Sequence, residues 1–400
     1  MRVSRLMLLL GLLLTTGLVA PAVGAVPVPA PACSWYGETD QRDVNIGAPD
    51  LDAYYWANPI AVTSGETVTL DGTYPSARYF SFHVYDRTGQ PLDSLYDAQL
   101  TPAKGSTSPF QPGNGRLGHG SYSMTIRFVA APKQRAANTL YAPVGSPGIA
   151  LLVYRVYVPT DAASPQGGVA FPQITLHPAS GADVRETSCS TTPPPFGSAL
   201  WSVAAESDYP SALRQSGGDA TKPVWERQFG SALGNQQNAY LAAQIDRQYG
   251  DIVVIHATAP TFPDNRRGVS PSKATQLRYW SFCVYDSQGE AGFGCAADYT
   301  SSLRDGSYTY VVSDPGQRPS NANAAHGVTW LPWGGTQATA QVVFRNMLPN
   351  PGYRYAAQRI TSPGQSARSV MGRYYPKAVY CSKARFESGG WQACFGSTSR

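Results

Sequence analysis

The chain has 400 residues, of which 14% are charged and 11% are aromatic, with 39 Gly and 33 Pro. This length exceeds one ordinary core, so we expect two domains of roughly 170 residues each. The aromatic content excludes a disordered chain, and low charge with abundant Gly and Pro favours a loop-rich extracellular β protein. The formal net charge of +5 is mild. Without a basic patch it argues against nucleic-acid binding.

The first 25 residues have the features of a secretory signal peptide. Arg2 and Arg5 form its positive end, LMLLLGLLLTTGLVA is the apolar run, and Val23-Gly24-Ala25 is a small-residue cleavage site. The run is short for a membrane anchor, and no later transmembrane segment follows. We therefore expect cleavage and export to the cell envelope or the medium, which removes two arginines and lowers the charge from +5 to +3.

Two long segments of the mature chain repeat each other. RYFSFHVYDRTGQ from Arg78 and RYWSFCVYDSQGE from Arg278 are identical at eight of thirteen positions. Later blocks recur in the same order: GSYSMTIRF with GSYTYVVSD, YRVYVP with FRNMLP, and AFPQITL with YYPKAVY. This order predicts an internal duplication. The expected limits are a first domain at 26–189, a Pro-containing linker at 190–222 and a second domain at 223–400.

The repeated blocks have the residue pattern of strands. YFSFHVYD alternates between two faces, and LLVYRVYVP and AQVVFRNML are rich in β-branched and aromatic residues. Gly-containing turns such as DRTGQP separate them. Helical pattern is confined to short segments such as NQQNAYLAAQI. We therefore predict an all-β chain with two tandem antiparallel β-sandwich, jelly-roll-like domains and a short helix at the start of each.

The six cysteines all lie after the signal segment, and their even number in an exported chain indicates disulfides. Fifteen pairings are possible. Loop closure favours Cys33–Cys189, Cys283–Cys295 and Cys381–Cys394. A zinc site is the alternative, but the chain has neither a Cys-x-x-Cys pair nor a His at ligand spacing. We predict no metal and no organic cofactor.

The motifs YWSFxVYD, DGSYTYVVS and TWLPW, followed by a strand with Arg and a closing Pro, resemble a bacterial β-sandwich family of unknown function. The chain is more closely similar to uncharacterised secreted actinobacterial proteins that end in AVYCSKARFESGGWQAC. The likeness covers most of the mature chain and is better in the second half, because the first half lacks TWLPW and the hairpin cysteines. It implies a fold and a location, and carries no activity.

Few residues point to catalysis. No Gly-x-Ser-x-Gly elbow occurs, and a glycan hydrolase would need two carboxylates, for which Asp298 and Asp305 are the candidates. Asp305 precedes Gly306 and also suits a plain turn. Arg155 and Arg345 lie in apolar strands, where we expect each to pair with a carboxylate of its own domain. We interpret the scattered histidines, such as His256, as structural.

The segment NAAHGVTWLPWGG provides the candidate ligand-binding residues His326, Trp330 and Trp333. Exposed Trp rings stack on apolar faces of sugars or lipids, and His can donate or accept hydrogen bonds. The alternative is that the tryptophans plug the sandwich core. The leading hypothesis is a secreted, disulfide-stabilised, monomeric binding protein for a polysaccharide, a lipid or another apolar-faced molecule. A secreted glycan hydrolase and a purely structural envelope component remain the alternatives.

Overall fold

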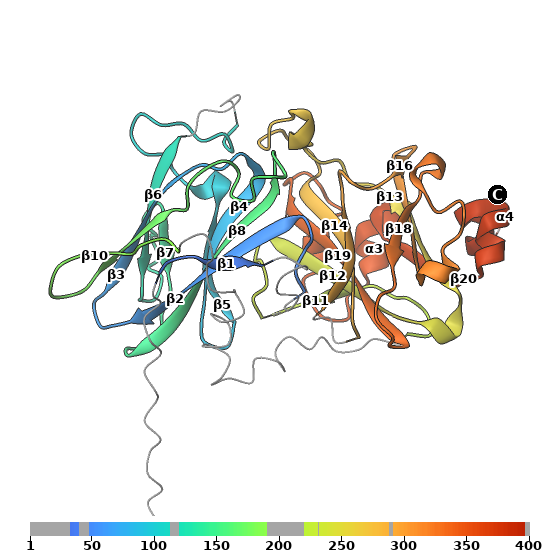
Figure 1. The fold of residues 1–400 in the computed structure, drawn as a ribbon, viewed down its shortest axis with the longest axis horizontal. Helices are drawn as coiled ribbons and strands as arrows, with labels where there is room; N and C mark the ends of the chain where they lie inside the picture. The colour runs from blue at the N-terminus through green and yellow to red at the C-terminus, as the bar shows by residue number, and fades with distance from the viewer. Residues whose placement is uncertain are drawn as a thin grey trace, which may run out of the picture.

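The computed structural model describes residues 33–39, 48–112, 120–189, 220–230, 232–287 and 291–396. The predicted signal segment and nearly all of the predicted linker lie outside these ranges. Figure 1 shows the described chain as two halves lying next to each other, coloured blue to green and yellow to red. We call residues 33–189 the first half and residues 220–396 the second half.

The all-β prediction is confirmed. Strands form four sheets in the described residues, and the α-helices found there are the short α3 (Ala367–Met371) and α4 (Lys383–Phe395). In Figure 1 the four sheets stack from left to right as layers, with α4 beyond the last layer. We call the two sheets that meet at the middle the inner sheets and the other two the outer sheets.

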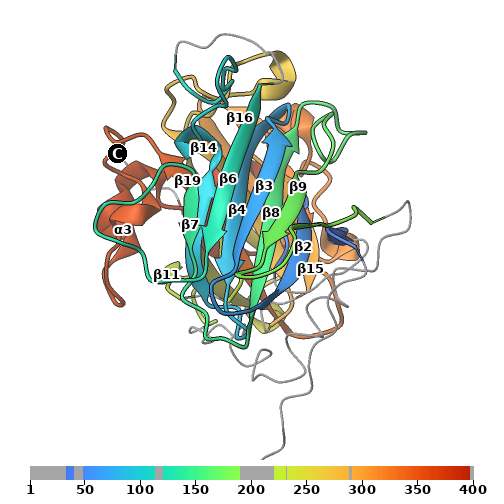
Figure 2. The ribbon, with the colours of Figure 1, turned by 90° about the vertical axis from the view of Figure 1, so that its left-hand side faces the viewer.

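The first half contributes one inner and one outer sheet. The inner sheet has the order β1 (Tyr36–Thr39), β2 (Ala53–Val62), β8 (Gly148–Pro159), β4 (Ala77–Tyr85) and β5 (Pro91–Tyr96). The outer sheet, which faces the viewer in Figure 2, has the order β10 (Val184–Arg185), β9 (Gln173–His177), β3 (Thr67–Thr73), β6 (Ser121–Arg127) and β7 (Thr139–Tyr141).

The second half has the same arrangement. Its inner sheet has the order β11 (Glu226–Gln228), β12 (Asn238–Asp246), β19 (Thr339–Pro349), β14 (Leu277–Tyr285) and β15 (Gly292–Ala297). Its outer sheet has the order β16 (Leu303–Arg304), β17 (Ser307–Ser313), β13 (Ile252–Thr258) and β20 (Lys377–Cys381), and β18 (Thr329–Pro332) pairs in parallel with β17.

Segments that repeat in sequence occupy corresponding strands. Ser81 pairs with Arg155 between β4 and β8, and Ser281 pairs with Arg345 between β14 and β19. Both hairpins after these strands shift register at the same point, Val84/Tyr85 and Val284/Tyr285. β7 and β18 also correspond, since each runs parallel to the strand beside it in its outer sheet, β6 and β17 respectively. The domain limits and the jelly-roll-like connectivity stay predictions.

The predicted helix over NQQNAYLAAQI is wrong, because Asn238–Asp246 forms strand β12. Ala239, Leu241, Ala243 and Ile245 alternate along it and pack into the core of the second half. This period of two fits a strand, and β12 is paired along its whole length with β19. Long-range pairing therefore overrides the good helix propensity of Ala, Leu and Gln.

The three disulfides join the cysteines expected from loop closure. Cys33–Cys189 ties the two ends of the first half across 156 residues, and Cys283–Cys295 links β14 to β15. Cys381–Cys394 fastens α4 to β20. The described residues include no free cysteine. Because disulfides persist in oxidising compartments, this pattern is compatible with an extracellular protein.

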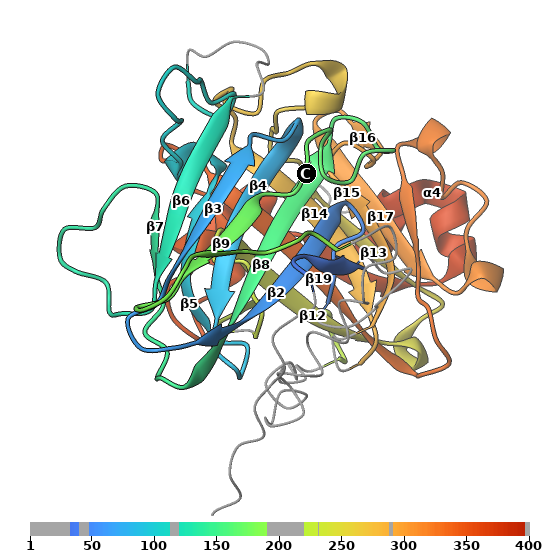
Figure 3. The ribbon, with the colours of Figure 1, turned by 60° about the vertical axis from the view of Figure 1, so that its left-hand side comes forward.

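The inner sheets are buried on both faces. Phe80, Phe82 and Val84 of β4 point into the core of the first half. Tyr79 of the same strand packs on the opposite face against Tyr157 and Tyr279, which places it between the halves. Figure 3 shows β4, β8 and β2 in front of β14, β19 and β12, with the two sheets facing each other. We call this contact the junction.

Contacts across the junction come in matched pairs. Arg78 forms a fully buried ion pair with Asp298, and Arg278 pairs with Asp97 at 3.1 Å. The Tyr85 hydroxyl donates to the carbonyl of Gly234, and the Tyr285 hydroxyl donates to the carbonyl of Pro49, both at 2.9 Å. Each half therefore sends one segment across to complete the inner sheet of the other half.

The expectation that Arg155 and Arg345 pair with carboxylates of their own domain is wrong. Arg345 lies 3.8 Å from Asp50 of the first half and donates to the carbonyl of Ala48 at 2.7 Å. Arg155 donates to the carbonyl of Leu233 in the second half at 2.7 Å, and has no ion-pair partner among the described residues. Asn235 is the counterpart of Asp50, since Tyr79 donates to Asn235 as Tyr279 does to Asp50. The segment that faces Arg155 therefore has an amide where the segment that faces Arg345 has a carboxylate.

The junction predicts a specific pH dependence of stability. Burial raises the pKa of Asp52 from its ordinary 3.8 to about 6, and the Asp50 carboxylate acts in the same direction. The folded state therefore holds this proton more tightly, so the contribution of Asp52 to stability is full below 3.8 and is lost as pH rises through about 6. Asp52→Asn abolishes this loss and keeps an oxygen for the hydrogen bond from Tyr299.

Urea unfolding at several pH values tests this. Relative to wild type, the free energy of unfolding of Asp52→Asn should rise by about 3 kcal/mol between about pH 3 and about pH 7. Wild type unfolded at each pH under the same conditions is the reference. A pH-independent difference for Asp52→Asn would contradict the burial of an ionisable carboxyl group there.

Candidate functional site

Helix α4 covers the outer face of the last sheet, at the far end of the molecule (Figure 1). Ser382 caps it by accepting a hydrogen bond from the Arg385 amide at 3.3 Å, which satisfies one of the free donors of the first turn. The fully buried Phe386 packs against Ile252 and Val254 of β13. The helix thus holds its place by a small apolar cluster and by the Cys381–Cys394 disulfide.

Strand β13 is apolar on both faces for this reason. Val253 and Ile255 point into the core of the sandwich, whereas Ile252 and Val254 point toward α4. His256 follows on the same side as Val254, at the rim of the covered patch. A continuous apolar run such as IVVI in β13 is typical of parallel strands, which are covered on both faces. Here the strand is antiparallel to both neighbours, and the second face is covered by α4.

His256 and Trp391 form one wall of an open cavity. The imidazole is stacked on the indole of Trp391 with ring centroids 3.7 Å apart, and its Nδ1 is hydrogen-bonded to Thr309 Oγ1 at 3.0 Å. Burial lowers the pKa of His256, and the positive charge of Lys377 lowers it further. The neutral imidazole is therefore favoured at neutral pH.

The cavity has a volume of about 710 Å³ and lies between α4, β13, β17 and the turn η5 (Ala324–His326). We call it the α4 pocket. Such a volume suits a small ligand or a few units of a polymer. Both hydrogen-bond donors and acceptors face it, contributed by residues that include Arg304, Asp305, Thr309, His326, Glu387 and Gln392.

The β16–β17 turn brings Arg304 and Asp305 to the pocket. Asp305 and Gly306 have φ values of 50° and 70°, as the two central residues of a type I′ hairpin require, which explains the Asp-Gly pair. The side chain of Arg304 packs over Gly327, where a Cβ would lie 2.7 Å from the Arg304 Cβ. Within the described residues neither charged group has an ion-pair partner, so both are available to a ligand.

The opposite rim carries two further polar side chains. Glu387 accepts a hydrogen bond from the Ser320 amide at 2.8 Å, and this bond lowers the pKa of its carboxyl group. His326 is exposed, with its Nδ1 hydrogen-bonded to Asn323 Oδ1 at 2.9 Å. The pocket therefore presents an ionised acceptor and an imidazole on the same opening.

The structure separates the three predicted ligand-binding residues. His326 lines the α4 pocket. Trp333 is only 1% exposed and belongs to the sandwich core, so its predicted role in a ligand platform is corrected. Trp330 is half-buried on the other side of the sheet, where its Nε1–H donates to Ser313 Oγ at 3.0 Å. The spacing of three residues along an extended chain places the two rings on opposite faces.

The two predicted carboxylates also lie apart. Asp305 lines the α4 pocket, whereas Asp298 is buried in the junction beside Arg78 and accepts a hydrogen bond from the Trp280 amide at 3.2 Å. Burial raises the pKa of Asp298 to about 7, against the opposing effect of Arg78. Its side chain is not exposed to solvent. These two groups therefore do not form the carboxylate pair of a glycan hydrolase.

His256, Trp391 and Glu387 are pocket residues that the sequence interpretation did not select. Trp391 and Glu387 lie in the closing segment FESGGWQAC. A tryptophan three residues before the last cysteine was the feature of this segment that could have indicated a binding site. His256 carried none, because a single His in an apolar strand gives no indication of what covers that strand.

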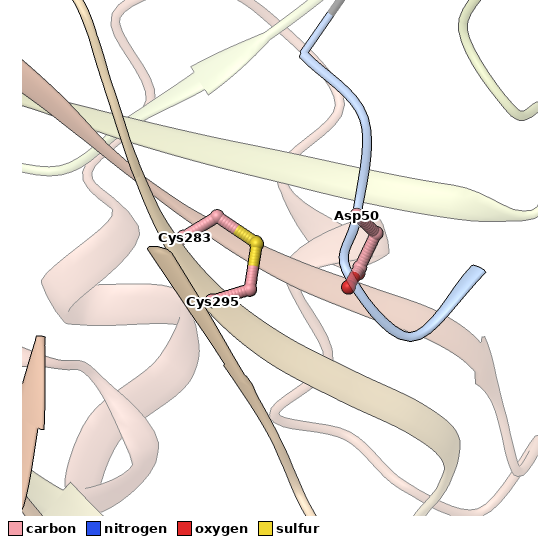
Figure 4. Close-up of side chains that lie close together, drawn as sticks. All are labelled: Asp50, Cys283 and Cys295. Atoms are coloured by element: carbon pink, nitrogen blue, oxygen red, sulfur yellow. A yellow bond between two sulfur atoms is a disulfide. The ribbon is translucent and has the colours of Figure 1, made fainter. Parts of the chain in front are cut away.

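One group of potential metal ligands occurs in the described residues. Asp50, Cys283 and Cys295 have ligand atoms within 4.8 Å of one another (Figure 4). Both sulfur atoms belong to the Cys283–Cys295 disulfide, and Asp50 accepts hydrogen bonds from Tyr279 at 2.8 Å and Ser281 at 2.6 Å. A metal needs the thiolate form of cysteine, so this cluster is part of the junction and not a metal centre.

No protein-family model matches the chain, and no curated protein sequence matches it. The structure is similar to the crystal structure of an uncharacterised protein from Burkholderia cenocepacia, with a TM-score of 0.53 and 15% identity, over 88% of this chain and 82% of that chain. A protein from Vibrio parahaemolyticus aligns with a TM-score of 0.38 and 11% identity, over 83% of this chain and 89% of that chain.

The Burkholderia similarity concerns the fold alone, and it extends across both halves. The resemblance to actinobacterial secreted proteins stays a prediction. In the part of the chain that the structure describes, no helix is both long enough and apolar enough to span a membrane.

The positions of the tryptophans predict unequal effects of truncation. Trp333→Ala should lower the free energy of unfolding by roughly 3–5 kcal/mol, as expected for a buried aromatic residue. Trp330→Ala should cost clearly less, because its ring is half-buried. Thermal melts of both variants beside wild type measure the difference. A melting temperature of Trp333→Ala close to that of wild type would contradict the burial of this ring.

Proposed function

We propose that the protein is a secreted binding protein that holds a short segment of polysaccharide in the α4 pocket. The observation that carries this proposal is the composition of that pocket. A partly exposed indole, Trp391, forms its wall beside a set of hydrogen-bonding side chains of both kinds. Sugars present an apolar face to aromatic rings and hydroxyl groups to polar side chains, so both features serve one ligand class.

The charges of the pocket favour binding over hydrolysis. Glycoside hydrolysis needs a carboxylic acid whose pKa is raised so that it can protonate the leaving group. The pKa of Glu387 is lowered, as is that of His256. Both groups therefore suit acceptance of hydrogen bonds from hydroxyl groups better than donation of a proton. The proposal requires no metal and no organic cofactor.

We also infer that the two halves descend from one duplicated sandwich, which the matching strand orders and registers support. The α4 pocket is then a later specialisation of the second half. In the described part of the first half, no helix covers the corresponding outer sheet. The exposed face of that sheet is polar, with Thr69 hydrogen-bonded to His177 at 2.8 Å.

The test is a glycan array and a cell-wall retention assay with the mature chain. Wild type should bind at least one glycan class saturably, and Trp391→Ala should weaken this binding about tenfold, equivalent to about 1.4 kcal/mol. Arg304→Ala removes an exposed charge from the same pocket and should weaken binding without lowering the melting temperature. Tyr249→Ala is the matched control, since this exposed aromatic residue neither lines the pocket nor belongs to the apolar cluster under α4.

Two results would count against the proposal. Absence of saturable binding to any glycan or cell-wall fraction would favour a structural role in the envelope. Binding that survives both Trp391→Ala and Arg304→Ala would place the glycan site elsewhere on the protein.

A further inference from the structure

A second cavity, of about 510 Å³, lies at the rim of the junction and is lined by both halves. The first half contributes Ser76, Phe110 and Thr160, and the second half contributes the loop 265–271. This loop includes the gold-coloured turn η3 (Asn265–Arg267) at the top of the molecule in Figure 1. We call it the junction pocket. It is separate from the α4 pocket, with which it shares no lining residue.

The wall of the junction pocket is fixed by buried hydrogen bonds. Asn265, which is 5% exposed, donates to the carbonyl of Val158 at 2.9 Å and to Thr160 Oγ1 at 3.1 Å. It also accepts a hydrogen bond from Arg78 Nε at 3.0 Å, and so connects the pocket to the buried ion pair of the junction. A wall held in this way is preformed, which lowers the entropic cost of binding.

The chemistry of the pocket is an apolar interior with a cationic rim. Its apolar lining includes Pro75, Ala77, Phe110, Val269 and Pro271. Arg266 and Arg267 supply the positive charge, and none of the described residues that line the cavity is acidic. Arg267 is 85% exposed, although its Nε lies 3.4 Å from Asp264.

Arg266 is held more firmly than Arg267. Its guanidinium group lies over the Tyr299 ring at 4.7 Å, and its Nε donates to the carbonyl of Pro159 at 3.2 Å. These contacts use one nitrogen, so the planar fork retains donors for an anion. A positioned and partly desolvated guanidinium group recognises carboxylate and sulfonate oxygens well.

From this geometry we propose that the junction pocket binds a small amphiphilic molecule with an apolar body and a single anionic group. The anionic group contacts Arg266 and Arg267, and the apolar body packs on Val269 and Pro271. Because residues of both halves form the walls, the site exists only while the junction is intact. The proposal does not depend on glycan binding at the α4 pocket.

Fluorescence titration of the mature chain with anilinonaphthalene sulfonate tests the proposal, with the neutral phenylnaphthylamine as comparison. The sulfonate should bind saturably at one site, more tightly than the neutral probe, and dodecanoate should displace it. Arg267→Gln should raise the Kd about tenfold, the loss of one hydrogen bond to a charged group. Val269→Glu, which places a negative charge inside the cavity, should abolish binding.

Arg185→Gln is the matched control, since this exposed arginine lies on β10, which contributes no residue to the pocket, and should leave the Kd unchanged. Melting curves and circular dichroism of each variant separate pocket binding from probe uptake by unfolded chain. Absence of saturable binding by native protein would overturn the proposal. So would equal affinity for the neutral probe, or insensitivity to both pocket variants.

Discussion

The fold depends on the contact between the two inner sheets. β4 and β14 carry apolar residues on one face and tyrosine and serine on the other, and the junction buries both second faces together. Arg78 and Asp298 are each fully buried there, so removal of Arg78 would leave the carboxyl group of Asp298 buried without its cation. Removing one partner of such a pair typically costs about 3–5 kcal/mol. The halves are therefore held together in part by buried polar groups that cannot form hydrogen bonds with water.

The exchange of segments makes this dependence mutual. Residues 48–50 cap Tyr285 and Arg345 of the second half, while residues 233–237 cap Tyr85, Tyr79 and Arg155 of the first half. In each inner sheet, buried tyrosine and arginine side chains donate hydrogen bonds to backbone carbonyls of the other half. The pattern has the reciprocity of a two-fold interface between identical subunits, although one chain supplies both sides.

Because the inner sheets are occupied, ligands can reach only the outer sheets and the rims. The α4 pocket exists because Cys381–Cys394 and Phe386 hold a helix against the outer face of β13. The junction pocket exists because two loops from different halves meet at the edge of the contact. The two candidate sites therefore have different requirements: the first needs the C-terminal helix, and the second needs the intact junction.

The sequence carried the local features well. Alternation in YFSFHVYD, the Asp305-Gly306 turn and the short loops closed by Cys283–Cys295 and Cys381–Cys394 all depend on neighbouring residues, and the structure has each of them. The repeat also placed β4 and β14 in matching positions.

The sequence could not show which distant segment packs on the second face of each inner strand. Alternation alone suggests that Tyr79, Ser81 and Tyr85 face solvent, yet all three are buried by the other half. For the same reason Asp298 resembled a possible catalytic group and proved to be an ion-pair partner of a residue 220 positions away. Trp333 is buried in the core, and Trp391, for which the sequence predicted no role, lines the α4 pocket, because burial depends on which distant element lies above a ring.

Differential scanning calorimetry of the mature chain at neutral pH tests whether the junction makes the two halves one cooperative unit. We expect a single transition whose calorimetric and van't Hoff enthalpies agree, because unfolding either half exposes the buried charges of the other. Two separate transitions, or a single transition whose van't Hoff enthalpy is clearly below the calorimetric enthalpy, would contradict it.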